Sequence, residues 1–263
     1  MIDLEIAEKI FHEYVAEYPN VPRIKLKEEH IIRVMQISIN LAKQLKLSKE
    51  DVKLAGLIGL MHDIGRFEQA KVYDTFDDKV SINHAVYSSM QLFEKGLIRR
   101  FIQDDTYDYI IKKAVENHNK FQIEEGLDER TLLHCKIIRD SDKCDIYEQI
   151  IQSDAKLVFD GPYNKENVFE KKVLDDFYHY KGINSADMKT VLDDYVRKAA
   201  FAYGLYFKES LYYIKERDYT NRLTKKFEET FEFVNKNTKK EIKKINDFAN
   251  EYIDKMVKNK NNI

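Results

Sequence analysis

The side chains with the clearest chemical potential are histidines and aspartates on helix-like stretches of the chain. His62 and Asp63 are adjacent and directly follow an apolar run from Leu54 to Met61. A His-Asp pair alone says little, because a chain of this composition can contain one by chance. Three further histidines lie at a predicted helix end or share a helix's apolar face, namely His30, His84 and His118. Imidazole and carboxylate groups bind divalent transition metals, and several helices can bring them to one point in a bundle.

The segments around these residues resemble the HD-domain superfamily of metal-dependent phosphohydrolases. The resemblance covers roughly residues 25 to 150. It rests on His30, on Gly-Leu-Met-His-Asp-Ile-Gly-Arg around His62, and on Arg-Asp-Ser-Asp-Lys-Cys-Asp around Asp142. His84 and His118 occupy the places where two-metal members of that superfamily carry additional histidines.

The resemblance implies a centre with one or two divalent ions, for which Mn, Fe, Ni, Co, Zn and Mg are the candidates. Asp63 would bridge two ions. His30, His62 and Asp142 would complete one site, and His84 and His118 the other. Ligand type alone does not choose among these metals.

Three aspartates compete for the last ligand position, Asp140, Asp142 and Asp145. Asp142 shares one helical stripe with Cys135 and Ile138, whereas Asp140 points elsewhere. Asp142 is therefore the predicted ligand. Asp145 lies one turn further on a similar face and could hold a ligand imidazole or a water, as metal sites often require.

Cationic residues beside the predicted ligands suit a phosphorylated substrate. Arg66 follows the His-Asp motif, and Lys120 and Lys143 adjoin predicted ligands, so all three are expected to bind phosphate oxygens. Together with Asp63 they are the predicted catalytic residues. The resemblance implies that a metal-activated water hydrolyses a small phosphate ester, which could be a nucleotide, a phosphomonoester or a phosphodiester.

Two other functions fit the same ligand set. Some relatives with these ligands use two irons to oxygenate a carbon substrate, and a regulatory module with a vestigial metal site is a third class. The remaining histidines and both cysteines are expected to be surface or packing residues, namely His12, His134, His179, Cys135 and Cys144.

Composition argues against several classes of function. The 44 basic and 46 acidic side chains nearly cancel, and no segment gathers the basic excess that grips a long nucleic acid. Two cysteines are too few for a disulfide framework, and the first residues do not resemble a signal peptide. No apolar stretch approaches the roughly 20 residues of a membrane-spanning helix. We therefore expect a cytoplasmic monomer or homodimer, without a membrane or nucleic-acid partner, that acts on a small phosphorylated substrate.

The scarcity of helix-breaking residues, 3 prolines and 8 glycines, predicts an all-α fold, here an HD-domain helical bundle with additional C-terminal helices. Apolar periodicity predicts helices over 3–18, 27–45, 48–61, 83–95, 105–118, 129–152, 165–180, 185–216 and 220–258. Residues 66–82 are predicted to form an irregular pocket loop. The expected plan is an N-terminal helix in 1–24 packed on an HD core, 25–152, with a C-terminal helical extension, 153–263, on the same domain.

Overall fold

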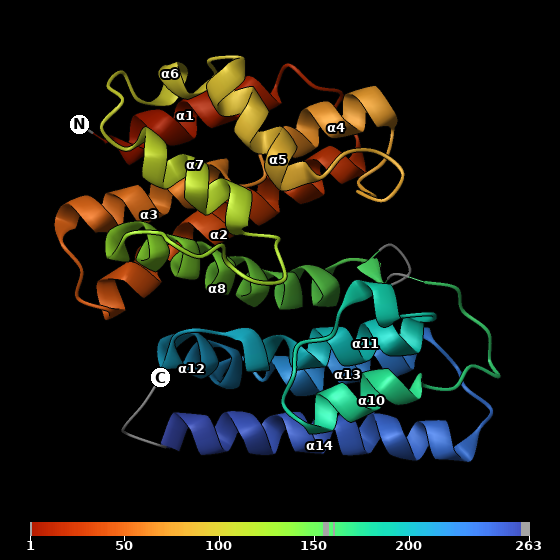
Figure 1. Cartoon of the computed structure of the whole chain (residues 1–263). Coiled ribbons are helices and arrows are strands. Elements are labelled where there is room, and N and C mark those ends of the chain that lie inside the picture. Colours follow the sequence, from red (N-terminus) through yellow and green to blue (C-terminus); the bar gives the residue numbers. More distant parts are fainter. Residues whose placement is uncertain (1, 155–157, 160, 259–263) are drawn as a thin grey trace. The chain divides into compact units, whose positions relative to one another are not determined.

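The computed structural model describes residues 2–154, 158–159 and 161–258, and this part of the chain contains helices and no strand (Figure 1). The predicted all-α fold is confirmed. The chain forms two compact units, Met1–Asp145 and Ile146–Ile263. The division at residues 24 and 152 stays a prediction, and part of its last segment lies outside the described residues.

The first unit is built from α1 to α7 and the first part of α8. Their bounds are α1 Leu4–Val15, α2 Pro22–Gln44, α3 Lys49–Met61, α4 Gly65–Tyr73, α5 His84–Ser89, α6 Ile98–Phe101, α7 Asp108–Asn117 and α8 Glu129–Gln152, with a π-helical turn, η1 Met90–Glu94, after α5. Helix α8 continues past the boundary between the units.

Helix α3 runs through the core of this unit. The Ser48 side chain caps its start by accepting a hydrogen bond from the Asp51 N–H at 3.0 Å, and every residue from Leu54 to Met61 is buried. Gly59 allows α2 to approach closely, because a Cβ there would lie 2.8 Å from the Met35 Cα. The apolar second half of α3 therefore carries the His-Asp pair into the interior.

The prediction of an irregular loop over residues 66–82 is wrong in its first half. Residues Gly65–Tyr73 form α4, which buries Phe67 and Ala70 and ends at Asp74 in the left-handed conformation, φ 53°. The segment holds Glu, Gln, Ala and Lys, which favour helix, and Phe67 and Ala70 are spaced by three residues so that both face the core. The irregular loop is confined to residues 74–83.

The second unit contains α10 Lys171–Tyr178, η2 Ser185–Asp187, α11 Val191–Ala199, η3 Ala200–Gly204, α12 Lys208–Glu216, α13 Tyr219–Thr230 and α14 Lys236–Lys258. The long helices predicted over 185–216 and 220–258 are therefore interrupted. Between α13 and α14 the backbone makes a hydrogen bond outside any helix: the Val234 N–H donates to the Lys165 carbonyl at 3.1 Å. The ring of Tyr195 stacks on Phe227 at 4.6 Å, so this part of the aromatic-rich stretch is core.

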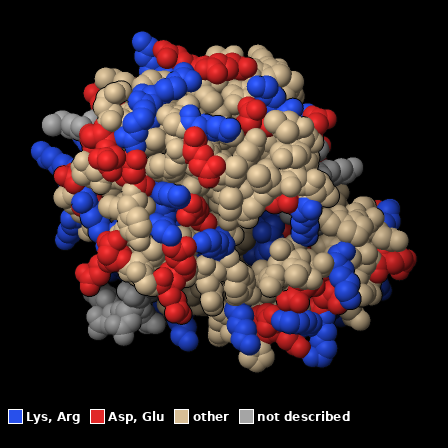
Figure 2. Space-filling view, turned by 45° about the horizontal axis from the view of Figure 1, so that its top comes forward, with Lys and Arg blue, Asp and Glu red and all other residues tan. Residues whose placement is uncertain are grey.

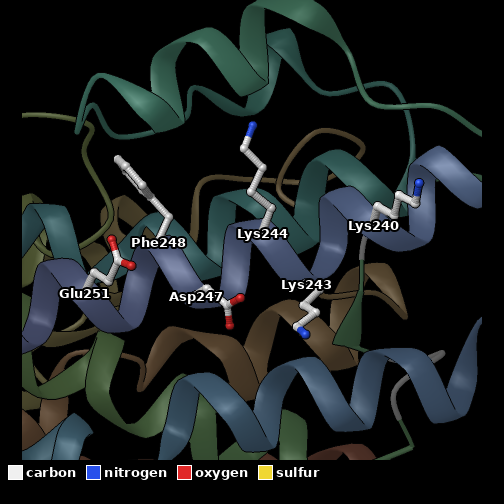
Figure 3. A pocket seen from close by; sticks show the side chains of 6 residues that line it. All are labelled: Lys240, Lys243, Lys244, Asp247, Phe248 and Glu251. Carbon is white, nitrogen blue, oxygen red and sulfur yellow. The ribbon is translucent and has the colours of Figure 1, made fainter.

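The surface carries mixed charge. Figure 2 shows basic and acidic side chains interspersed over the visible face, as the balanced composition predicts. A surface pocket along α14 is lined by Lys240, Lys243, Lys244, Asp247, Phe248 and Glu251, and none of the predicted site residues lines it (Figure 3). Among the described residues, no helix combines the length and apolar character that crossing a membrane requires.

Candidate metal centre

Five helices or helix ends bring the six predicted ligands together. His30 lies within α2, His62 caps the end of α3 and Asp63 follows it. His84 is the first residue of α5, and His118 caps the end of α7. Asp142 lies within α8. The ligands therefore come from segments far apart in the sequence.

The first cluster surrounds one oxygen of Asp63. The Oδ2 atom lies 3.7 Å from His30 Nε2 and 3.6 Å from His62 Nε2. Asp142 Oδ1 lies 3.2 Å from His30 Nε2 and 3.7 Å from His62 Nε2. Ligand atoms about 2.1 Å from one metal are separated by about 3 to 3.5 Å at angles between 90° and tetrahedral. His30, His62 and Asp63 therefore form a group whose ligand atoms could hold a metal ion, and Asp142 lies beside its two imidazoles.

The second cluster surrounds the other oxygen of the same carboxylate. Asp63 Oδ1 lies 3.6 Å from His84 Nε2 and 3.5 Å from His118 Nε2, and the two imidazole nitrogens are 3.1 Å apart. Three protein ligands leave coordination positions open for water or substrate. Each oxygen of Asp63 faces a different cluster, so this carboxylate could contribute a ligand atom to both.

The Nδ1 atom of each of these histidines has a partner that turns Nε2 inward. His62 Nδ1 pairs with the Gly59 carbonyl at 2.8 Å, and His118 Nδ1 with the Val115 carbonyl at 2.7 Å. The other two pair with carboxylates, His30 with Asp145 at 2.6 Å and His84 with Asp78 at 2.5 Å. Such partners fix the tautomer and orientation of metal-binding histidines. Asp145 therefore contacts the imidazole of a predicted ligand, as the sequence interpretation expected.

Three inward-facing atoms of the described site are buried without a hydrogen-bond partner: His30 Nε2, His62 Nε2 and Asp63 Oδ1. Burying polar atoms without partners is costly, so such atoms usually mark a bound water, ion or functional role. Imidazole nitrogens and carboxylate oxygens in this arrangement fit a divalent metal. The buried atoms without partners are therefore of the types that bind metal ions.

The protonation states of Asp63, His62 and His84 suit a metal site. Burial raises the pKa of Asp63, but Lys27 and His62 outweigh it and hold this pKa well below the usual range. Burial lowers the pKa of His62, and burial together with Arg66 lowers that of His84 to about 4. At neutral pH these two imidazoles are neutral and the carboxylate is ionised, which are the protonation states that bind metal.

Lys27 is a site residue that the sequence interpretation missed. Its Nζ lies 2.9 Å from Asp63 Oδ2, and its side chain is 12% exposed. Lys27 precedes His30 by three residues on α2, so both side chains lie on the same helical face. This spacing was the signal that could have identified it.

The three predicted cations differ in their placement. Arg66 Nε lies 3.8 Å from Asp63 Oδ1, but the Arg66 Nη1 atom donates to the Phe76 carbonyl at 2.6 Å and to Asp78 at 2.9 Å. Lys143 follows Asp142 on α8, and burial together with a nearby arginine lowers its pKa to about 8. Lys120 is 40% exposed and instead pairs with a neighbouring glutamate, Glu124, at 2.9 Å. Their catalytic roles stay predictions.

Arg139 is a second residue that the sequence interpretation missed, and no sequence pattern points to it. It is 4% exposed and donates to the carbonyls of Asn117, Lys120 and Phe121 at 2.7, 2.5 and 3.2 Å. These carbonyls lie on both sides of His118, one at the end of α7 and two in the turn after it. The buried guanidinium thus fixes the segment that carries this ligand.

A comparison with protein families matches residues 28–147 to the HD domain. The matched region contains all six predicted ligands, so the resemblance noted in the sequence is confirmed there. No curated protein and no solved structure matches the chain.

Proposed function

We propose that the chain is a metal-dependent phosphohydrolase that cleaves a small phosphate ester with water, since residues 28–147 match the HD domain, which implies a metal-dependent, hydrolase-type superfamily. The observation that carries the proposal is the position of Asp63, whose two oxygens face two separate histidine clusters. Divalent ions in such paired sites lower the pKa of an attacking water and neutralise phosphoryl oxygens.

The cationic side chains around Asp63 support an anionic substrate. Lys27 and Arg66 are 12% and 13% exposed, and both lie over the ring of Phe76, at 6.0 and 5.6 Å from its centroid. Arg66 Nε has no hydrogen-bond partner in the described structure. We propose that Lys27 and this N–H bind phosphate oxygens, because an ammonium and a guanidinium both suit that task. Lys27 is added to Arg66, Lys120 and Lys143, the cations that the sequence interpretation gave this role.

The proposal also covers the substrate class, the cellular compartment, the oligomeric state and the metal ions. The substrate is small and phosphorylated, with a nucleotide, a phosphomonoester or a phosphodiester as candidates. The protein acts in the cytoplasm as a monomer or homodimer. The ions are one or two of Mn, Fe, Ni, Co, Zn and Mg.

The test is hydrolysis by the metal-loaded protein. Chains loaded separately with Mn²⁺, Fe²⁺, Co²⁺, Ni²⁺, Zn²⁺ or Mg²⁺ are offered p-nitrophenyl phosphate, bis-p-nitrophenyl phosphate and nucleoside monophosphates. We expect release of product that a chelator stops and that Asp63→Asn abolishes. Asp105→Asn, an exposed carboxylate of the same unit, is the control and should retain activity.

The same experiment separates the alternatives. A loaded protein that releases no product from any ester refutes phosphohydrolase activity. Oxygen uptake by the iron-loaded chain with a carbon substrate would instead support a di-iron oxygenase. A folded chain that retains no metal after purification in each of these ions would support a regulatory module.

A further inference from the structure

Three of the four clustered histidines are held by helices. His62 and His118 pair with carbonyls three residues earlier, so the ends of α3 and α7 position them directly. His30 pairs with Asp145 on α8, and Arg33 holds that carboxylate from α2 at 2.6 Å. The position of His84 has a different origin.

The partner of His84 belongs to the irregular loop 74–83. Asp78 Oδ2 accepts from the backbone N–H of His84 at 3.3 Å and pairs with its Nδ1 at 2.5 Å. Asp78 Oδ1 accepts from Arg66 Nη1 at 2.9 Å and from Gln69 Nε2 at 3.1 Å. One carboxylate therefore connects the imidazole to α4.

The loop is fastened to α4 on both sides of Asp78. On the N-terminal side, Arg66 Nη1 donates to the Phe76 carbonyl at 2.6 Å. On the C-terminal side, the buried Gln69 donates to Ser81 Oγ at 2.9 Å and to the Ile82 carbonyl at 3.0 Å. The orientation of the His84 ring thus depends on this segment being in place.

We propose that Asp78 is the positioning residue of the second metal site, and that loop 74–83 controls through it whether a second ion binds. The proposal rests on the metal centre of the proposed function. The first site has no contact with Asp78 in the described hydrogen bonds and ion pairs, since its ligands are oriented by α3 and α8. Loss of the Asp78 carboxylate should therefore affect the two sites unequally.

The test is a metal titration of Asp78→Asn. Asparagine keeps the shape of the side chain, but its NH₂ group cannot accept a hydrogen bond, so either His84 or the Arg66–Gln69 pair loses its acceptor. Mn²⁺ binding is measured by calorimetry and by elemental analysis after dialysis. We expect two ions in the wild type and one tightly bound ion in the variant, with the second affinity weakened by about 10- to 100-fold.

Two further variants make the result specific. Asp77→Asn removes a neighbouring exposed carboxylate of the same loop and should bind both ions as the wild type does. Asp145→Asn should weaken the first ion instead, because it releases His30. Melting in chelator shows whether each metal-free variant remains folded.

Several results would overturn the inference. They are a wild type that binds fewer than two ions, an Asp78→Asn protein that binds two ions with wild-type affinity, and one that loses both ions equally. Because metal content is the measurement, a chain that behaves as expected but hydrolyses no ester would refute only the proposed reaction.

Discussion

Replacing Gly65 with alanine should disturb the metal centre through the backbone. An added Cβ would lie 2.5 Å from the Ser88 N and 2.8 Å from both the Ser88 Cα and the Tyr87 carbonyl carbon. All three are backbone atoms of α5, which cannot rotate away as a side chain can. Ordinary contact begins at 3.4 Å, so α4 and α5 must separate by 3.4 − 2.5, or roughly 0.9 Å.

The expected cost follows from this displacement. Overpacking a filled core typically costs about 1–3 kcal/mol. At about 2–4 °C per kcal/mol for a chain of this size, a cost of ~2 kcal/mol lowers the melting temperature by roughly 4–8 °C. His84 begins α5, and a site of this kind tolerates displacements of only about 0.5 Å. Gly65→Ala should therefore also weaken binding of the second ion.

Gly56→Ala is the matched control. Its Cβ would lie 2.7 Å from Ile39 Cγ1, but the atoms it meets belong to side chains that can rotate. Alanine also favours a helix interior by about 1 kcal/mol over glycine, which offsets part of the crowding. Calorimetric melting in chelator and Mn²⁺ titration compare the two variants. If Gly65→Ala melts with the wild type and binds two ions, the argument from backbone crowding is refuted.

Three other predictions concern charge and metal. Lys27→Met breaks a buried ion pair with Asp63, so urea unfolding in chelator should show a free energy of unfolding that is lower by about 3 kcal/mol. Calorimetry should show tighter binding of the first ion, because Lys27 no longer competes with the metal for Asp63. If both values are unchanged, Lys27 does not compete with the metal. Mn²⁺ at 100 times its dissociation constant should stabilise the wild type by about 2.7 kcal/mol, and identical melting in Mn²⁺ and chelator would contradict a metal site. Burial lowers the pKa of His134 in the folded state. As pH falls below about 6.5, His134 is therefore protonated in the unfolded chain before the folded one, and the free energy of unfolding decreases. Urea unfolding from pH 7 to 5 should therefore show a steeper loss for the wild type than for His134→Asn, and parallel curves would rule this out.

The clustered residues could be predicted because regular helices place them. His118 shares a face with Ile111 and Val115, and Asp142 shares one with Cys135, so helical spacing alone directs these side chains inward. The same rule would have included Lys27, one turn before His30. The prediction that these side chains meet at one place came from the resemblance to a known family and not from their spacing.

Other features depend on tertiary contacts that no local pattern encodes. Asp78 lies among several polar residues of its loop, and only the folded structure distinguishes it from Asp77 as the partner of His84. Lys120 adjoins a predicted ligand in sequence, but it lies beyond the end of α7, where helical spacing no longer sets the direction of a side chain, and it pairs locally with Glu124. Breaks such as the one at residues 231–235 were missed because apolar residues continue across them at helical spacing.

The shared carboxylate gives the centre an uneven tolerance to substitution. If the clusters bind metal as proposed, a change at His84 or His118 removes one ligand from one cluster only, and descendants of the chain could keep a centre with a single ion. A change at Asp63 removes a ligand from both clusters at once. Over evolutionary time we therefore expect descendants of this chain to lose the two later histidines first, with Asp63 persisting for as long as any ion is kept.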